Sequence, residues 1–392
     1  MTGTAHPTRA SSETYLQAVG RRLWASTGAK LGLAWLSVVA VGAVFAPLLA
    51  SSHPLVWQTA EGVSSPWLEH ASATDLALPL LTAWAVGVLA WWGRRRAWSA
   101  GRRLAWVVGG GSVIIAACWM VADPPVLVIY DRYRVAETSG AVDWSVEAPI
   151  PYSATDRLRD LGDRKLEPPG ADHLLGTTLN NADMASRLIH ACRIALAIGF
   201  IATGIALVIG VILGGLMGYF SGWVDLLGMR LVEVFEAVPQ IYLLLSFVAF
   251  IGRDLYLMMA VIGFLSWTGY ARFVRAEFLK LRQQDFVLAT RALGLPLWST
   301  LFRHILPNGV APVLVTASFG IASAILVESF LSFLGLGLVD EPSWGGLLNQ
   351  ALTGAGGFNW WIALFPGLAI FLTVFAYNLI GEALRDAIDP KV

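Results

Sequence analysis

Apolar residues along this chain form long blocks separated by shorter polar segments. Each block has about the length, roughly 20 residues, that an α-helix needs to cross the hydrocarbon core of a bilayer. The eight blocks are Leu31–Ala50, Thr74–Gly93, Leu104–Ala122, Ile194–Tyr219, Leu226–Ile251, Leu255–Val274, Val310–Leu338 and Asn359–Gly381. Backbone groups inside lipid must be hydrogen-bonded within the segment, so the blocks should be helices. The pattern predicts an all-α integral membrane protein, a polytopic helical bundle with about eight transmembrane helices.

The positions of lysine and arginine indicate which helix ends face the cytoplasm. Basic residues gather in the N-terminal tail and in the loops after the second and sixth blocks: Arg9, Arg21, Arg22 and Lys30; Arg94, Arg95, Arg96, Arg102 and Arg103; Arg275, Lys280, Arg282, Arg291 and Arg303. Residues 51–73 contain no lysine or arginine, and the only charged residues in the loop after the seventh block are Asp340 and Glu341. Because cytoplasmic loops hold the basic excess, we expect both termini in the cytoplasm.

This map divides the chain into four segments. We expect a cytoplasmic tail over residues 1–30, and a first transmembrane helix with an additional transmembrane hairpin over 31–122. An irregular extracytoplasmic cap should cover 123–190, and the main transmembrane core 191–392. The first apolar block has the length of a full span, so we expect a retained helix rather than a cleaved signal peptide.

Composition excludes several classes of function. Hydrophobic residues make up 56% of the chain and charged residues 14%, whereas soluble domains usually carry about 25% charged residues. The formal net charge of zero gives no support for a nucleic-acid partner. Two cysteines, Cys118 and Cys192, and six scattered histidines lack the spacing of metal ligands, so we expect no metal or other cofactor. A disulfide between the two cysteines stays open.

The chain also lacks the motifs of an ATPase or a hydrolase. A P-loop requires Gly-Lys followed by Ser or Thr, and none of the four lysines, Lys30, Lys165, Lys280 and Lys391, follows a glycine. The nucleophile motif Gly-x-Ser-x-Gly is also missing. We therefore expect no enzymatic activity in this polypeptide.

A few polar or small residues inside the apolar blocks are candidates for function. Glu233 and Glu236 lie one helical turn apart beside Arg230, and we interpret them as paired structural carboxylates. Glu328, four residues from Ser332, is interpreted as a helix–helix or subunit contact, with pore lining as the alternative.

The glycine-rich face that includes Gly214 and Gly218 allows close helix approach. It would serve either packing within the chain or a moving interface with a second subunit.

Residues 276–308 combine helical periodicity with an apolar surface. Leu281–Leu293 reads as a helix, Gly294 sits where a C′ glycine ends one, and Pro296 suits the first turn of the next. The second helix, expected to stop before Pro307, should expose Leu297, Trp298, Leu301 and Phe302. Such a ridge needs cover, which either a partner's groove or the bilayer surface could provide.

This loop resembles the conserved cytoplasmic motif of ABC importer permeases. It matches at Ala289, Gly294, Leu306 and Pro307, while Leu288 replaces the usual acidic residue and Thr290 an alanine. Further stretches resemble the second permease of dipeptide/oligopeptide (peptide/nickel) importers, in order over about residues 173–392: His173–Thr177, Gly218–Gly222, Ser266–Arg272, Leu331–Gly337, Phe365–Ala369 and Arg385–Pro390.

The resemblance implies the ABC type I importer permease fold over the C-terminal two-thirds and an inner-membrane location. It implies that the loop holds coupling helices that dock into an ATPase subunit, through Asp285, Ala289, Thr290, Arg291, Ala292, Gly294, Trp298, Arg303, His304 and Pro307. Gly214, Gly218, Glu328 and Ser332 are candidates for the pore or the subunit interface.

The implied partners are a second homologous permease, two ABC ATPase subunits, and an extracytoplasmic solute-binding protein that meets outer loops including Glu341–Gly346. Peptides are the default substrate, although nickel, sugars and peptide-like antibiotics use similar permeases. The extra hairpin departs from the usual six spans, and a stand-alone secondary transporter or channel is the alternative function.

Overall fold

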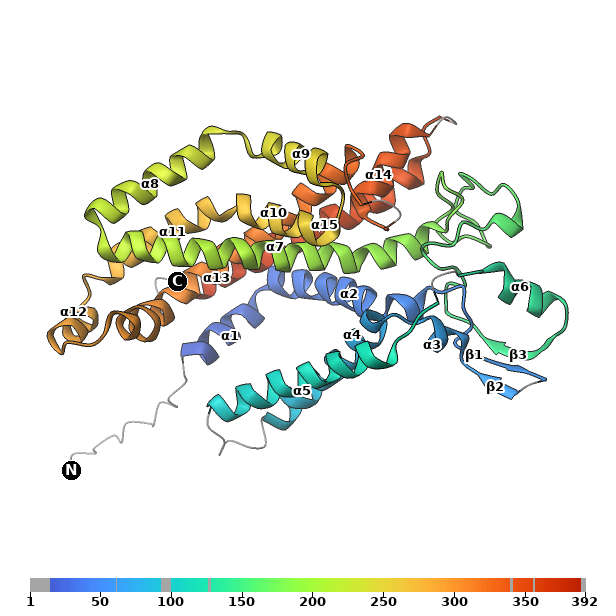
Figure 1. The fold of residues 1–392 in the computed structure, drawn as a ribbon, viewed down its shortest axis with the longest axis horizontal. Coiled ribbons are helices and arrows are strands. Elements are labelled where there is room, and N and C mark those ends of the chain that lie inside the picture. The colour runs from blue at the N-terminus through green and yellow to red at the C-terminus, as the bar shows by residue number, and fades with distance from the viewer. Residues whose placement is uncertain are drawn as a thin grey trace, which may run out of the picture.

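The computed structural model describes residues 15–60, 62–92, 100–125, 128–338, 341–354 and 357–388. Three features of the charge map, Arg9, the run 94–96 and Asp340, lie outside these ranges. Figure 1 shows a bundle whose long helices run side by side, with a cap at one end and α12 at the other.

The helices of the bundle follow the predicted blocks closely. They are α1 (Tyr15–Ala25), α2 (Thr27–Leu49), α4 (Ala73–Trp92), α5 (Ala100–Val121), α7 (Met184–Phe220), α8 (Gly222–Ala237), α9 (Gln240–Ile251), α10 (Leu255–Leu265), α11 (Trp267–Leu281), α12 (Asp285–Ala292), α13 (Leu306–Phe333), α14 (Trp344–Thr353) and α15 (Trp360–Ile388). A π-helical segment, η2 (Ser299–Ile305), precedes α13.

Length and hydropathy identify the helices that can cross a membrane. Within the described ranges five helices pass this test, and the number reaches seven if each of two bent pairs forms one span. Helix α5 adds a shorter apolar stretch, Ala105–Val121. These segments coincide with the eight predicted blocks, so the fold is the multi-span helical bundle that the sequence predicts.

Two of the predicted spans are bent helix pairs. Helices α8 and α9 meet at 71°. The break falls at Val238-Pro239, where Val238 is extended, as a residue before proline prefers. Helices α10 and α11 meet at 41°, beside Ser266, whose hydroxyl donates to the Ile262 carbonyl at 2.7 Å. Such bonds back to the preceding turn bend helices.

Helix α7 is the central element of the bundle, and small residues let α11 lie directly against it. A Cβ added at Gly214 would lie 2.4 Å from the Ala271 carbonyl oxygen, and one at Gly218 would lie 2.6 Å from that of Arg275. Both contacts are closer than van der Waals distance and involve backbone. The glycine face therefore packs α7 against α11 of the same chain.

Gly214→Ala is expected to destabilise the bundle, because α11 would have to move away from α7. Overpacking of this kind costs about 1–3 kcal/mol. Gly204→Ala is the matched control, since Gly204 lies on the same helix with nothing within 4 Å of the added Cβ. Denaturant unfolding of the purified chain in detergent should separate the two variants. Equal unfolding midpoints would show that close α7–α11 packing is not needed.

The start of α7 is fixed by residues of the His173–Thr177 stretch. The Asp183 carboxylate accepts a hydrogen bond of 2.7 Å from the Ser186 amide and thereby caps the helix. Its other oxygen contacts His173 Nδ1 at 3.0 Å, and both side chains are 1% exposed. The helix thus begins ten residues before the predicted span, inside the segment expected to belong to the cap.

The cap differs from the expected irregular segment 123–190 because two separate loops build it. Strand β1 (Val56–Thr59) pairs antiparallel with β2 (Gly62–Ser64) and with β3 (Val142–Val146), in the order β2-β1-β3. Helices α3 (Pro66–His70) and α6 (Asp131–Thr138) and the 3-10 turn η1 (Arg159–Leu161) complete it. Residues 51–72, which lie within the predicted segment 31–122, therefore belong to the cap.

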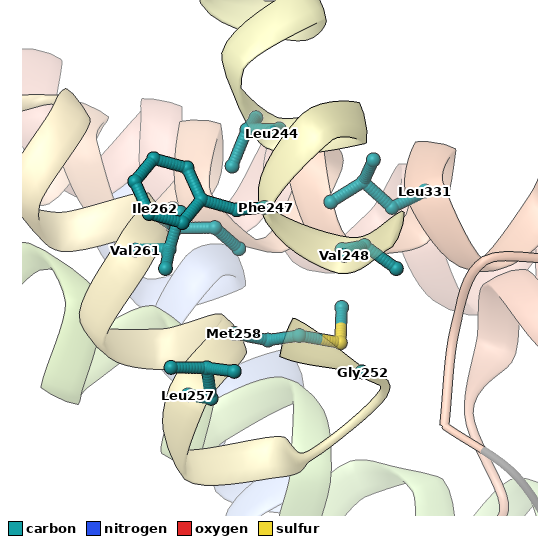
Figure 2. A pocket seen from close by; sticks show the side chains of 9 residues that line it. All are labelled: Leu244, Phe247, Val248, Gly252, Leu257, Met258, Val261, Ile262 and Leu331. Atoms are coloured by element: carbon teal, nitrogen blue, oxygen red, sulfur yellow. The ribbon is translucent and has the colours of Figure 1, made fainter. Parts of the chain in front are cut away.

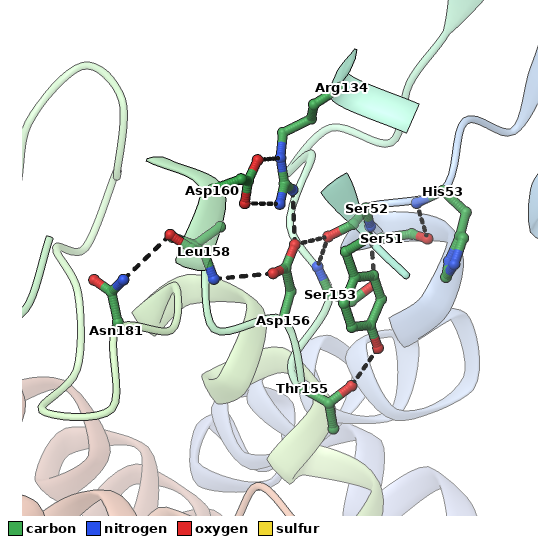
Figure 3. A network of polar contacts seen from close by, with 11 residues as sticks. Ser51, Ser52, His53, Arg134, Ser153, Thr155, Asp156, Leu158, Asp160 and Asn181 are labelled. Atoms are coloured by element: carbon green, nitrogen blue, oxygen red, sulfur yellow. Dashed lines mark hydrogen bonds and ion pairs between the residues drawn. The ribbon is translucent and has the colours of Figure 1, made fainter. Parts of the chain in front are cut away.

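A buried polar network holds these two loops together (Figure 3). The Asp156 carboxylate, 3% exposed, accepts from the Ser52 hydroxyl and from Arg134 Nη1, each at 2.7 Å. Arg134 also pairs with Asp160 at 2.6 Å, and its hydrogen bonds hold the pKa of Asp160 below the usual value. These contacts tie the loop after α2 to the segment before α7.

Candidate functional site

The segment between α11 and α13 folds as a compact corner at the end of the bundle opposite the cap (Figure 1). Val287 of α12 is fully buried in an apolar cluster with Val274 and Phe278 of α11 and with Leu301 and Ile305 of η2. Because the cluster includes all three elements, the corner is a rigid extension of the bundle.

Gly294 ends α12 as the sequence predicts. Its φ is +68°, a conformation that glycine adopts without steric cost. The Leu295 amide donates to the Thr290 carbonyl and the Gly294 amide to the Arg291 carbonyl, each at 3.0 Å. This pair of bonds is the Schellman motif, which turns the chain sharply into the next helix.

The expectation that the second helix stops before Pro307 is wrong. Segment η2 continues without a break into α13, which begins at Leu306 and contains Pro307 in its first turn. Proline has no amide hydrogen, so the continuous helix gives up one backbone hydrogen bond at position 307. The corner is therefore joined without a flexible loop to α13, a 28-residue helix of the bundle.

The corner exposes an apolar surface formed by Leu288, Leu293, Leu297, Trp298 and Phe302, which we name the apolar loop surface. Leu293 is 77% and Trp298 71% exposed, and the rings of Trp298 and Phe302 lie 3.9 Å apart. Leu301, expected to be exposed with them, is buried in the cluster around Val287. The sequence interpretation missed Leu288 and Leu293, because which residues of this short helix face inward depends on its packing against α11 and η2.

The predicted docking residues divide clearly between surface and interior. Thr290 is buried, and its hydroxyl donates to the Val287 carbonyl at 2.7 Å, so it supports the loop from inside. His304 is partly buried, and the others are exposed: Asp285, Ala289, Arg291, Ala292, Gly294, Trp298, Arg303 and Pro307. The exposed residues surround the apolar loop surface on the same corner.

Basic side chains connect this corner to the end of α7. The Arg291 guanidinium lies 4.7 Å from the centre of the Tyr219 ring, and Arg282 Nη1 donates to the Tyr219 carbonyl at 3.1 Å. One helix further on, Arg275 pairs with Asp225 through two bonds. The corner is therefore fastened to α7, while α11, which leads into it, is paired with α8.

The acidic residues inside the spans are paired or buried. Glu233 pairs with Arg230, and Glu236 with Arg272, in agreement with the interpretation as structural carboxylates. Glu328 and Ser332 are each 2% exposed, and the Ser332 hydroxyl donates to Glu328 Oε1 at 2.6 Å. The start of α14 covers them, since a Cβ at Gly345 would lie 2.2 Å from the Ser329 carbonyl oxygen. Glu328 is thus buried beneath α14 and hydrogen-bonded within its own helix.

A small pocket between α9 and α10 has an entirely apolar lining. Figure 2 shows its residues, which come from α9, α10, the connecting turn at Gly252, and Leu331 of α13. A lining without polar groups offers no hydrogen bonds to a polar solute, so this pocket is a feature of helix packing.

Cys118 and Cys192 are both free thiols, which answers the open question of a disulfide between them.

The bundle of spans with a rigid corner at one end defines a membrane transport subunit. The family model for the inner membrane component of binding-protein-dependent transport systems matches residues 206–392. A glutathione transport system permease of Pectobacterium atrosepticum is 40% identical over 67% of this chain and 88% of its own length. A dipeptide transport system permease of Alkalihalophilus pseudofirmus is 37% identical over 58% of this chain and 75% of its own length.

The chain therefore belongs to this family, as a permease of the dipeptide/oligopeptide type and a transmembrane subunit of an ABC importer. An oligopeptide transport system permease of Haemophilus influenzae is 39% identical over 56% of this chain and 70% of its own length. A solved methionine ABC transporter, inward facing, covers 53% of this chain with a TM-score of 0.44 and 18% identity. The family match begins at residue 206, so the additional hairpin and the cap lie outside it.

Proposed function

We propose that this chain forms, with a second homologous permease, a translocation pathway for peptides, driven by separate ATPase subunits. The observation that carries the proposal is the apolar loop surface, held by the Gly294 turn at the end of a continuous helix. Its exposed tryptophan and phenylalanine are of the kind that anchors protein interfaces. Relatives named for dipeptides, oligopeptides and glutathione support a peptide substrate.

In this proposal both termini and the corner face the cytoplasm, and the cap faces outward. Two observations support the orientation. Helix α1, with Arg21 and Arg22, lies toward the end of the bundle that carries α12, and basic residues mark cytoplasmic segments. The cap is at the opposite end, where a solute-binding protein would meet Glu341 and the start of α14.

Reconstitution tests the proposal directly. Proteoliposomes would contain this chain either alone or with the second permease and the ATPases encoded beside it, and would be loaded with labelled dipeptide, glutathione or Ni²⁺ in separate assays. We expect transport that needs ATP and all subunits, with the peptides preferred. Flux through the chain alone, driven by a proton gradient, would overturn the proposal in favour of a secondary transporter.

Glu328→Gln distinguishes ATP-driven import from proton-driven secondary transport. The amide oxygen can still accept the hydrogen bond from Ser332, so ATP-driven uptake should stay within about two-fold of wild type. Glu328→Leu removes the acceptor, leaves the Ser332 hydroxyl unpaired, and should lower stability by about 1–3 kcal/mol. Loss of uptake in a stably folded Glu328→Gln variant would instead mean that a proton on this carboxyl takes part in transport.

A further inference from the structure

The additional hairpin and the cap enclose a cavity that the proposed function does not use. Its volume is about 780 Å³, and its walls come from α2, α4, α7 and α10, with cap residues closing one end. Helix α4 is attached to the core across this cavity, because Arg193 Nη1 of α7 contacts Asp75 Oδ1 of α4 at 2.6 Å. The family match excludes most of these walls.

Polarity changes along the cavity from one end to the other. At the cap end polar side chains, Ser51, His53, His70, Tyr130 and Ser153, line the cavity together with apolar residues such as Trp67 and Val128. At the other end it is apolar: Ala40, Leu196, Ala197, Phe200, Ile201 and Met259. At 1.5 Å per residue, the α7 wall from residue 190 to 201 spans about 16 Å along the bundle.

The polar end contains buried hydrogen-bonding atoms without a protein partner. His53 is 7% exposed, and its Nε2 has no partner. Burial, followed by the neighbouring His70, lowers the pKa of His53 to about 4, so the ring is neutral at pH 7. Arg193 bonds through Nε to the Ala43 carbonyl at 3.1 Å and through Nη1 to Asp75, while its buried Nη2 has no partner. Unsatisfied buried donors are costly.

The apolar end opens where a bilayer would lie. Phe200 is 56%, Ile201 44% and Tyr256 71% exposed, and these side chains belong to helices of the predicted spans. A small polar solute would leave this half of the cavity without favourable contacts. Asp75 is neutralised by Arg193, and Glu341, the other carboxylate of the lining, is exposed to solvent, which screens its charge.

We propose that this cavity binds one phospholipid, with the headgroup phosphate at the end lined by Arg193 and His53 and an acyl chain along Phe200 and Ile201. A phosphodiester supplies the acceptor oxygens that an arginine fork matches, and an acyl chain covers the apolar wall. The lipid would join the additional hairpin to the core helices, and its site is separate from the corner between α11 and α13.

Photocrosslinking tests the site in the purified full-length chain. The probe is a phosphatidylglycerol with a diazirine in its acyl chain, and labelled peptides are mapped by mass spectrometry. We expect labelling of the α7 segment around Phe200, reduced about 10-fold in Arg193→Gln, as loss of a charge-assisted bond implies. The matched control is Arg164→Gln, because Arg164 pairs with exposed Asp172 in the cap and does not line the cavity.

A second variant keeps the test decisive if Arg193→Gln fails to fold. His53→Phe retains an aromatic ring against His70, whose ring centre lies 4.2 Å away, and removes both ring nitrogens, Nε2 among them; labelling should fall. Equal labelling of Arg193→Gln and Arg164→Gln, or of His53→Phe and wild type, would mean nonspecific contact with bilayer lipid and overturn the proposal. Displacement of the probe by millimolar inorganic phosphate would also overturn it, because an anion alone would then suffice.

Discussion

Gly294→Val is expected to abolish ATP-driven uptake while the amount of chain in the membrane stays unchanged. A left-handed conformation costs an L-residue about 1–2 kcal/mol, and a β-branched one more, so the turn at φ +68° would rearrange. The Schellman bonds of Leu295 and Gly294 would break with it. The apolar loop surface would then lose its shape, although no transmembrane helix is touched.

Gly140→Val is the matched control for this variant. Gly140 has a φ of +73° and, like Gly294, open space where a Cβ would be added, but it lies in the cap. The backbone strain is therefore equal, whereas the distance from the corner is large. Uptake of labelled peptide by whole cells, normalised to chain in the membrane fraction, gives the comparison. If both variants lose uptake equally, general destabilisation explains the effect and the coupling role is wrong.

Trp298→Ala should weaken binding of the ATPase subunits about 30-fold, because truncation of a central aromatic anchor typically costs 2 kcal/mol or more. Trp298 is 71% exposed and its ring lies 3.9 Å from that of Phe302, so its removal changes the surface rather than the buried cluster around Val287. Co-purification of the ATPases in detergent, followed by a binding titration, measures the change.

Trp24→Ala provides the control, since Trp24 is 65% exposed on α1, outside the corner. This pair of variants also separates the two interpretations that the sequence left open for the loop. Unchanged ATPase binding in Trp298→Ala, together with weaker association of the corner with lipid vesicles, would favour a bilayer-surface role and contradict docking.

Local chemistry explains why much of the candidate site could be predicted. Gly294 ends its helix because a left-handed residue there is a local requirement that only neighbouring backbone groups impose. Trp298 and Phe302 are exposed as expected. Leu301 and Thr290 turned inward because Val287, Phe278 and Ile305 surround them, and such contacts between separate helices leave no periodic signal in so short a segment.

The breaks in the predicted spans could be predicted only in part from the sequence. Proline at 239 forces Val238 out of the helical region, so the bend between α8 and α9 has a cause visible in the sequence, whereas its 71° angle depends on packing. Pro307, in contrast, does not break its helix. This proline lies inside a continuous helix, in which the π-helical segment η2 precedes α13.

The sequence by itself determined the membrane spans and the missing ATPase motif, because lipid imposes length and hydropathy on each segment separately and a phosphate-binding motif is contiguous. The tertiary structure alone decided which loops pair in the cap, which face of α7 receives α11, and that Arg193, Asp75 and His53 meet around one cavity. These features bring together residues far apart in the sequence, 118 positions for Asp75 and Arg193, and their free energy comes from burial and hydrogen bonds that exist only after the chain has folded.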